Sequence, residues 1–399
     1  MSMEEIKLAD KIKCFGCSTC KSVCLHGAIT MKKSEGFYYP SINNKRCKSC
    51  GLCIDNCIAL QYEKVNANTI KRIFSAYSRD DYIRVKSSSG GLSREIINWF
   101  YNKYENPKVY GCVLNDQLKA IHVSGQTPKE FDQFYGSKYT MSYLGSVIDD
   151  IKRDLKNGSN ILFLGTPCQA ASIWMAFKNS EYKDKVLIVD IICHGPGSSK
   201  LWDDYIAFIE EKYGKINHYY FRDKSGGWRN YSIKIITESE KTVQNTPELK
   251  IWSYLFFKGF SQKLSCFNCK FSNSKRFSDI TLGDFWGIEK VDPEMTDESG
   301  VSFVAVNSNK GLDILFDLKN NIVYREENYE IALATQNNLN GGRDKPQYYE
   351  EFWEDYNSKG FIYIAKKYGE YNFIGRIRTR LVNFLRQYNL LIIVKKIVR

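Results

Sequence analysis

Residues 14–24 read CFGCSTCKSVC, and residues 47–57 read CKSCGLCIDNC. Both stretches follow one pattern, C-x-x-C-x-x-C-x-x-x-C. Three thiolates this close can each bind one iron of a cubane if the backbone wraps tightly around it, and the two-residue gaps allow that wrap. The repeat therefore predicts two [4Fe–4S] clusters near the start of the chain.

The fourth cysteine of each stretch is expected to bind the cluster held mainly by the other stretch, as in two-cluster bacterial ferredoxins. The two expected ligand sets are Cys14, Cys17, Cys20 and Cys57, and Cys47, Cys50, Cys53 and Cys24. A proline usually follows the fourth cysteine, whereas Leu25 and Ile58 stand there in this chain. Because proline binds no iron, this departure changes the turn and leaves the ligands intact.

Zinc and disulfides are the two other uses of such cysteines. Structural zinc sites usually take two pairs of ligands separated by a longer loop, which this compact repeat fits poorly. Disulfides need an oxidising compartment, and residues 1–10 contain no apolar stretch of the kind that a signal peptide requires. The 13 cysteines are odd in number and mostly clustered, which favours reduced, metal-bound thiols and a cytoplasmic location.

The bulk composition indicates a folded chain of more than one domain. At 399 residues the chain is long for a single core, and its 43% apolar and 14% aromatic content suits a well-buried interior. No apolar run approaches the roughly 18 residues of a membrane span. The net charge of +12 is compatible with nucleic acid, an anionic membrane or an acidic partner. Because no nucleic-acid-binding signature accompanies that charge, no nucleic acid partner is expected.

Beyond the cysteine repeats, the sequence predicts an α/β domain. Short apolar runs rich in Ile and Val, at residues 161–164 and 186–193, are typical of buried strands in a parallel sheet. Strands are predicted at 109–114, 120–124, 160–164, 187–192, 219–222 and 231–237, and a helix at 146–156. Up to about residue 215 this order has the βαβ rhythm of an α/β domain, and beyond it the pattern is α+β.

The predicted fold class is an α+β ferredoxin-like dicluster module followed by an α/β domain with a mixed, partly parallel sheet and a C-terminal helical tail. The expected domain bounds are 1–62 for the dicluster module, 63–80 for a linker, 81–310 for the α/β domain, and 311–399 for a C-terminal extension that ends in a basic amphipathic helix.

The C-terminal tail has a charge pattern of its own. From Gly375 to Arg399 there are seven Lys or Arg residues and no acid. Apolar residues recur there at helical spacing, at Ile377, Leu381, Phe384, Leu385, Tyr388 and Ile392. One hypothesis is a basic amphipathic helix in peripheral contact with a membrane surface or a partner. The other, which we favour, is a helix docked on its own domain with a solvated basic face.

Four further cysteines lie outside the repeats. Cys168 and Cys193 each follow a predicted strand, and Cys266 and Cys269 form a C-x-x-C in a loop. Strand ends on one edge of a parallel sheet converge, so a loop folding over that edge would bring the four thiols together. We favour a third [4Fe–4S] cluster, with zinc as the alternative metal and small buried core cysteines as the alternative without metal.

Six short stretches carry a resemblance to a known family. They read SSSGG at 87–91, GSKY at 136–139, GTPCQ at 165–169, CHG at 193–195, FRDK at 221–224 and SDITLGDFWG at 278–287. In this order, behind the cysteine repeats, they make the chain similar to the family of coenzyme F420 hydrogenase/dehydrogenase beta subunits, in the version with an N-terminal dicluster ferredoxin domain. The resemblance implies bound FAD and a cluster on Cys168, Cys193, Cys266 and Cys269.

The same stretches contain the expected flavin-binding residues. These are Ser87, Ser88, Ser89, Gly90, Gly91, Gly136, Ser137, Lys138, Thr166 and Asp284. Hydroxyls, backbone N–H groups and glycines can approach a pyrophosphate closely. The alternative for residues 87–91 is a flexible turn before a helix N-cap. No G-x-G-x-x-G follows a predicted strand, so a Rossmann-type NAD site has no support.

The expected catalytic residues are His194, Lys138, Arg222 and Asp223. His194 could relay a proton to the flavin, and Lys138 could neutralise a phosphate or the reduced flavin. Arg222 and Asp223 could bind an acidic substrate or the flavin. The structural alternatives are a local hydrogen bond at His194, a solvated lysine at 138 and a charged hairpin at 222–223.

Together these expectations describe an FAD- and [4Fe–4S]-dependent oxidoreductase. Electrons would pass from a low-potential, ferredoxin-like donor through the clusters to FAD, and on to coenzyme F420 or another small organic substrate. The alternative is a non-catalytic electron-transfer subunit of a hydrogenase or formate dehydrogenase type complex. The expected partner is a ferredoxin or a redox partner subunit.

Overall fold

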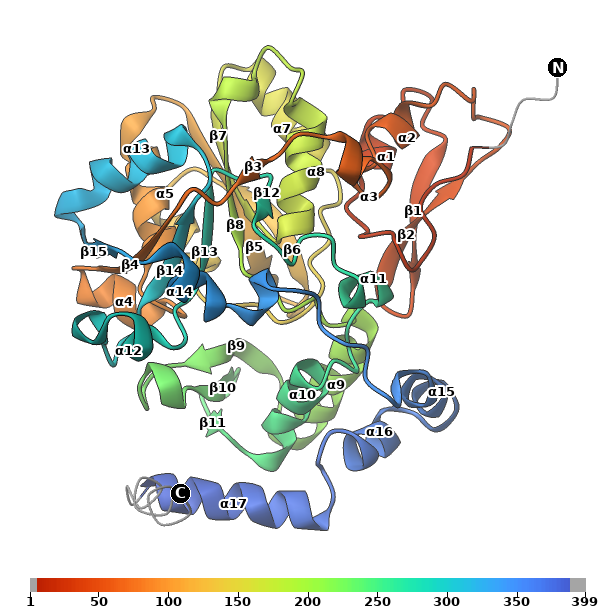
Figure 1. Cartoon of the computed structure of the whole chain (residues 1–399). Helices are drawn as coiled ribbons and strands as arrows, with labels where there is room; N and C mark the ends of the chain where they lie inside the picture. The colour runs from red at the N-terminus through yellow and green to blue at the C-terminus, as the bar shows by residue number, and fades with distance from the viewer. Residues whose placement is uncertain (1–5, 388–399) are drawn as a thin grey trace.

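The computed structural model of the protein describes residues 6–387 (Figure 1). Its central element is an eight-stranded sheet in the order β15-β4-β14-β13-β8-β7-β5-β6. The strands are β4 Arg72–Ser78, β5 Pro107–Leu114, β6 Ala120–Gly125, β7 Asn160–Gly165, β8 Val186–Ile191, β13 Ile280–Asp284, β14 Ser302–Val306 and β15 Ile322–Glu326. β13, β8, β7 and β5 run parallel, and the other neighbours pair antiparallel. The prediction of a mixed, partly parallel sheet is therefore confirmed.

The parallel strands are buried on both faces by two layers of helices. The layers are α5 Leu92–Lys103 and α13 Asn309–Asp317 on one face, and α7 Val147–Lys156 and α8 Pro167–Phe177 on the other. In β7, Leu162 packs with the first layer, whereas Ile161 and Phe163 pack with the second. Successive strand residues point to opposite faces, so an uninterrupted apolar run is what a strand covered on both sides requires.

The expected linker at residues 63–80 differs from what the structure has there. β4 is an interior strand of the sheet, paired with β14 on one side and β15 on the other. Two serines, Ser75 and Ser78, interrupt the apolar residues of its sequence, RIFSAYS. Both serines are buried in the folded sheet, where they bond to Glu327 and Glu95 respectively. β15 lies in the segment expected to be a C-terminal extension. The expected linker and the expected extension therefore each add a strand to the sheet of the central domain.

The dicluster module lies beside α7 and α8 (Figure 1). It comprises the hairpin β1 Ile29–Ser34 and β2 Phe37–Ile42, the short helices α1 Thr19–Ser22, α2 Leu52–Asp55 and α3 Ile58–Gln61, and the turn η1 Tyr62–Lys64. Phe15, Ile58 and Tyr62 of the module share one apolar cluster with Ala171 and Met175 of α8. The module is thus packed against the domain through a continuous apolar interface.

A second lobe lies below the sheet in Figure 1. It contains the antiparallel strands β9 Ile216–Asp223, β10 Ser232–Thr237 and β11 Thr242–Gln244, and the helices α9 Ser199–Tyr213, α10 Pro247–Phe257, α15 Tyr349–Lys359 and α16 Phe361–Lys367. These elements share one core in which Trp202, Tyr205 and Trp252 are fully buried. The strands expected at 219–222 and 231–237 are confirmed as β9 and β10.

Shorter elements connect these parts. They are β3 Asn68–Thr69 and β12 Lys275–Arg276, which pair, and α4 Asp81–Lys86, α6 Pro128–Phe131, α11 Leu264–Phe267, α12 Ile288–Val291 and α14 Tyr329–Ala334. Within residues 6–387, no helix combines the length and the apolar character needed to cross a bilayer.

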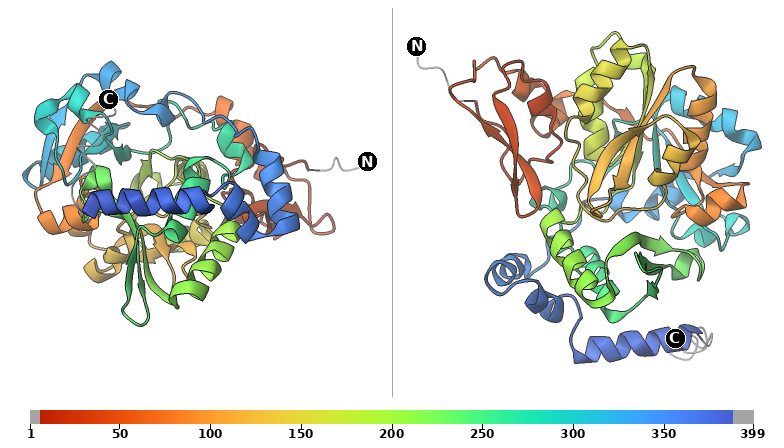
Figure 2. Two further views of the ribbon diagram at one scale, coloured as in Figure 1. Left: turned by 90° about the horizontal axis from the view of Figure 1, so that it is seen from below. Right: turned by 180° about the vertical axis from the view of Figure 1, so that it is seen from behind.

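The tail helix α17, Phe373–Gln387, lies at the outer edge of the second lobe (Figure 2). It docks on its own domain, as the favoured hypothesis expected, but through small and polar residues. Gly375 and Thr379 are buried, and Asn383 Nδ2 donates to the Asn245 carbonyl at 2.7 Å. The apolar side chains of Ile377 and its helical neighbours are exposed instead. Tyr388 and Ile392, also expected on this helix, lie outside the described residues.

Candidate functional site

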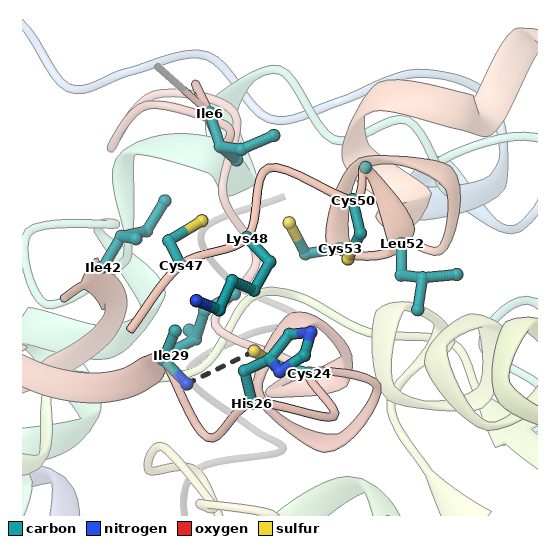
Figure 3. Close-up of a pocket in the computed structure, with 12 residues that line it drawn as sticks. Ile6, Cys24, His26, Ile29, Ile42, Cys47, Lys48, Cys50, Leu52 and Cys53 are labelled. Carbon is teal, nitrogen blue, oxygen red and sulfur yellow. Dashed lines mark hydrogen bonds between the residues drawn. The ribbon is translucent and has the colours of Figure 1, made fainter. Parts of the chain in front are cut away.

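One set of four cysteines surrounds a small space at the outer end of the dicluster module. Figure 3 shows the sulfur atoms of Cys24, Cys47, Cys50 and Cys53 around this space, which is closed by apolar side chains that include Ile29. The Ala28 N–H donates to Cys24 Sγ at 3.3 Å. Burial raises the pKa of the Cys53 thiol, and negative charge at Cys47 and Cys24 adds to the rise. The crossed set expected from the sequence, which we call the outer set, is therefore brought together.

The second expected set, which we call the inner set, surrounds a similar space nearer the α/β domain. It consists of Cys14, Cys17, Cys20 and Cys57. Burial raises the pKa of Cys57 to about 11, and the charge of Cys17 adds to the rise. Gly16 has a φ of 73°, and a Cβ there would lie 2.7 Å from the Tyr38 carbonyl oxygen. The tight wrap between Cys14 and Cys17 therefore requires glycine at this position.

The four remaining candidate ligands meet at the carboxyl edge of the sheet, and we call them the third set. Cys168 lies in the first turn of α8 directly after β7, and Cys193 follows β8. Cys266 lies in α11, and Cys269 follows it. Because β7 and β8 are parallel neighbours, their carboxyl ends share one edge.

The thiols of the third set lie close enough for their charges to interact. Burial raises the pKa of Cys193 to about 12, with negative charge at Cys269 adding to the rise. Burial likewise raises the pKa of Cys168 to about 12, with contributions from Cys193, Cys269 and Cys17. The last of these belongs to the inner set, so the inner and third sets are neighbours.

The donor chemistry of all three sets fits iron–sulfur clusters. Buried thiols are poor acids, and a group of four is stabilised as thiolates only by bound cationic metal. Among residues 6–387, no three His, Cys, Asp or Glu side chains are close enough to share a single metal ion. A cubane takes one cysteine per iron, so each set has the four thiols that one cluster would need.

The stretches expected to bind flavin converge on one region of the domain. Ser88 Oγ accepts hydrogen bonds from the Ser137 N–H and hydroxyl at 2.8 and 2.9 Å. Lys224 Nζ donates to the Ser89 carbonyl at 2.9 Å. Arg222 Nη1 donates to Asp284 at 2.5 Å. Four stretches separated in sequence therefore form one connected group.

Buried polar atoms without partners mark this region as suited to a polar ligand. The Arg222 side chain is 2% exposed, yet its Nε and Nη2 have no hydrogen-bond partner among the described residues. The hydroxyls of Ser87 and Thr140 are also buried and unpartnered within that part of the chain. Such groups normally have partners in folded proteins. Phosphate or carbonyl oxygens of a flavin would supply acceptors for them, so the residues present fit FAD.

Aromatic rings enclose the Arg222 guanidinium. Its central carbon lies 4.5 Å from the Tyr231 ring centre and 5.5 Å from that of Trp286. Trp286 stacks on Trp228 with 4.5 Å between centres, and the Trp228 indole N–H donates to Asp284 at 2.7 Å. These rings hold the arginine–aspartate pair in place. Trp286 lies inside one of the six family stretches, whereas Trp228 lies outside all of them.

The other expected site residues differ in their distance from the connected group and in their partners. The pKa of His194 is lowered chiefly by burial, and the charges of Arg343, Asp284 and Arg222 act on it, so His194 lies near the connected group. Asp223 instead bonds to Lys234 and Ser225 in the β9–β10 hairpin, as its structural alternative described. Thr166 is the N-cap of α8, where its hydroxyl donates to Gln169 at 3.0 Å and lies 3.3 Å from Cys168 Sγ.

Lys138 and the glycines have simpler surroundings. Lys138 Nζ donates to the carbonyls of Gln133 and Tyr135 at 3.2 and 2.8 Å, and burial lowers its pKa to about 8. Gly90 donates from its N–H to Ser302 Oγ at 3.0 Å, and Gly91 caps α5 with a φ of 95°. A Cβ at Gly136 would meet nothing within 4 Å. The lysine is therefore tied to its own loop, unlike a solvated surface lysine.

The fold and its thiol sets define an iron–sulfur protein in which a dicluster module is packed on an α/β domain. Residues 13–59 match the family of 4Fe-4S dicluster domains. Residues 158–331 match the family described as the C terminus of the coenzyme F420 hydrogenase/dehydrogenase beta subunit. Both matches agree with the family resemblance that the sequence stretches suggested, a beta subunit in the version with an N-terminal dicluster domain.

Two known proteins illustrate the similarity. The F subunit of F(420)H(2) dehydrogenase from Methanosarcina mazei is 26% identical over 202 residues, which is 47% of this chain and 56% of that protein. The chain thus spans little more than half the length of this curated relative. A chain in the xenon-derivatised F420-reducing [NiFe] hydrogenase complex from Methanosarcina barkeri is 15% identical, with a TM-score of 0.47. That match covers 71% of this chain and 98% of the other.

Proposed function

We propose that this chain is an FAD- and [4Fe–4S]-dependent oxidoreductase. It would move electrons between a low-potential, ferredoxin-like donor and coenzyme F420 or another small organic substrate. The observation that carries this proposal is the arrangement of the thiols, because every cysteine except Cys112 falls into the outer, inner or third set. The inner set adjoins the third set, and the third set adjoins the group around Arg222.

The chain's residues divide the work between two kinds of bound group. When bound, [4Fe–4S] clusters exchange single electrons and FAD exchanges one or two, so their combination couples one-electron to two-electron chemistry. The twelve cysteines of the three sets would hold the clusters. Apolar side chains such as Leu8, Ile29 and Met31 would keep water away from the two ferredoxin-type sites.

The group around Arg222 would bind FAD and orient it toward the third set. The loop 87–91 and Ser137 would supply hydroxyl and backbone N–H donors to phosphate. The two free N–H groups of Arg222 would bind a flavin carbonyl or phosphate oxygen. His194, which follows Cys193 and lies near Arg222 and Asp284, would hold or move a proton at its imidazole.

Ser87→Ala is expected to weaken FAD binding about fivefold, the effect of one lost neutral hydrogen bond. The Ser87 hydroxyl has no partner within the described residues, so its removal costs the protein no internal hydrogen bond. Arg222→Gln should weaken binding more, about 10- to 100-fold, because a charged donor is lost. The measurement is FAD per chain after anaerobic purification, together with FAD titration of the apoprotein.

Arg229→Gln is the matched control for the arginine. Arg229 lies seven residues further along, is more exposed and pairs with Glu289 at 2.6 Å. Its replacement should leave FAD and iron unchanged. Full FAD affinity in both Ser87→Ala and Arg222→Gln would contradict the proposed flavin site, and a wild-type protein that binds iron but no FAD would remove the flavin from the proposal.

A second candidate function is electron transfer without catalysis, as a subunit of a larger complex. The relative from M. mazei is itself named as a subunit of a dehydrogenase. An electron-transfer subunit would co-purify with a catalytic partner and would be inactive alone. An enzyme would turn over an organic substrate with reduced ferredoxin or dithionite in isolation, so purification from the native cell distinguishes the two functions.

A further inference from the structure

Helix α17 lies on the outside of the second lobe (Figures 1 and 2). It carries an exposed apolar stripe. The stripe consists of Phe373, Ile374, Ile377, Leu381 and Phe384, each between 49% and 78% exposed. At 3.6 residues per turn these five side chains lie on one face of the helix. Single exposed apolar residues are ordinary, but a contiguous group on one helix indicates an interaction site.

The docked face of α17 fixes the direction of the stripe. Thr379 is buried and Asn383 bonds to Asn245 on the side of the helix that faces the lobe. Helical spacing places Thr379 across the helix from Ile377, and Asn383 lies one turn beyond Thr379 on the same side. The stripe therefore points away from the body of the protein.

Arginines border the stripe on both sides. Helical spacing places Arg376 and Arg380 along one border and Arg378 along the other. Arg378 also pairs with Glu370 and donates to the Tyr254 hydroxyl at 3.1 Å. Residues 371–399 contain no Asp or Glu. An apolar stripe between arginine borders, on a helix that itself contains no acid, matches a helix that lies in a membrane interface with guanidinium groups at the level of the headgroups.

We propose that α17 binds an anionic lipid surface, with the stripe in the acyl boundary and the bordering arginines on the lipid headgroups. A protein groove could cover the stripe, but a partner would need acidic residues along both borders, whereas an anionic membrane presents negative charge on all sides. This inference concerns where the protein acts and does not depend on its cofactors.

The test is co-sedimentation of the full-length protein with vesicles. Binding to phosphatidylcholine vesicles that contain phosphatidylserine should exceed binding to pure phosphatidylcholine about tenfold and weaken with salt. The double variant Ile377→Glu, Phe384→Glu should abolish it. Ile331→Glu is the control, since Ile331 is 53% exposed on α14, away from the stripe. Equal binding of the wild type to both vesicle types would overturn the proposal. It would also be overturned if the wild type bound no vesicles and formed a homodimer that the double variant could not form, since the stripe would then bind a second copy of the chain.

A second, independent observation concerns Lys263, a residue that the sequence analysis missed. Lys263 is 1% exposed and lies three residues before Cys266. Its Nζ donates to the Tyr38 carbonyl at 3.2 Å and lies 4.1 Å from the centre of the Tyr39 ring. Within residues 6–387 it has no ion pair with a carboxylate, although a buried cation normally requires an anion.

The cysteines near Lys263 belong to two different sets. A Cβ at Gly16, inside the wrap between Cys14 and Cys17, would lie 3.0 Å from Lys263 Nζ. The Cys266 N–H donates to the Lys263 carbonyl at 2.9 Å. The charge of Lys263 acts on Cys14 and Cys17 of the inner set and on Cys168 and Cys266 of the third set. Lys263 therefore lies between the two sites at which clusters are proposed.

We propose that Lys263 is a positioning residue whose charge raises the reduction potentials of the inner and third clusters together. The inference rests on the proposed function, since it requires clusters at both sets. Reduction adds one electron, and hence one negative charge, to a cluster. A buried positive charge beside two clusters favours the reduced state of each, because burial removes most of the solvent screening.

Lys263→Met tests the inference in anaerobic redox titrations followed by electron paramagnetic resonance. The equilibrium constant for reducing the inner and third clusters should fall about tenfold or more, while that of the outer cluster stays unchanged. Lys48→Met is the control, because Lys48 lines the outer site but is solvent-exposed.

Three outcomes distinguish a failure of the role proposed for Lys263 from a failure of the proposed function. Unshifted potentials in Lys263→Met with full iron content would overturn the role of Lys263. Loss of iron from both Lys263→Met and Lys263→Gln would also overturn it, since the lysine would then serve cluster assembly. A wild-type protein without iron at the inner and third sets would instead refute the proposed function.

Discussion

Cys266→Ala is expected to remove the third cluster and leave the two ferredoxin-type clusters in place. Iron should fall from about twelve to about eight atoms per chain after anaerobic purification, because a buried three-thiol site no longer caps all four irons. Reduction of FAD by a ferredoxin-like donor should fall by orders of magnitude, whereas dithionite should still reduce the flavin directly. Iron and sulfide analysis and stopped-flow spectroscopy at the flavin band provide the measurements.

Cys112→Ala is the matched control, because Cys112 is the single cysteine outside the three sets. It lies in β5, partly buried, and its sulfur makes a weak contact with the Val113 carbonyl at 3.9 Å. This variant should keep all its iron and its rate of flavin reduction. Full iron content in Cys266→Ala, or lost iron in Cys112→Ala, would contradict the assignment of ligands to the third set.

The sequence predicted the thiol sets because their geometry is determined locally. Short gaps force the backbone to wrap around the space between Cys14, Cys17 and Cys20, and Gly16 supplies the required turn. The third set was accessible through topology instead. Two cysteines that follow parallel strands must share one sheet edge, so the ends of β7 and β8 bring Cys168 and Cys193 together.

Features that depend on partners far away in the sequence could not be predicted from the sequence in the same way. β4 reads as a polar connector because Ser75 and Ser78 gain their partners only in the folded sheet. Lys263 looks like any other lysine until α11 packs against the dicluster module. The docking of α17 through Thr379 and Asn383 reverses the usual rule that the apolar face of a helix is buried, and no helical periodicity could reveal that.

The residues proposed to bind flavin show a similar division. The structure connects the stretches at 87–91, 136–139 and 221–224 through Ser88, Ser89 and Lys224, whereas their binding of FAD stays a prediction. Roles within the stretches were harder to assign. Neighbours on a strand point to opposite sides, so Arg222 enters the group, whereas Asp223 bonds across the hairpin.

The crossed ligation leads to the second large effect, a contrast between Cys24→Ala and Cys57→Ala. Cys24 belongs to the first repeat in sequence but lies in the outer set, and Cys57 belongs to the second repeat but lies in the inner set. Each variant should lose one ferredoxin-type cluster and keep about eight irons per chain. Iron analysis alone therefore cannot distinguish the two variants. They differ in which electron-transfer path remains between the clusters.

Only the inner set is a neighbour of the third set, since the charge of Cys17 acts on Cys168 and Lys263 lies between them. Cys57→Ala should therefore break the connection, so that donor-driven flavin reduction falls at least about a hundredfold and magnetic coupling between the inner and third clusters disappears. Cys24→Ala removes the outer cluster and should slow acceptance of electrons while that coupling persists. The reverse result, with coupling lost in Cys24→Ala and kept in Cys57→Ala, would mean that each repeat binds its own cluster without crossing. In that case the fourth cysteines would have to turn back toward their own repeats, against the arrangement of the two thiol sets in the module.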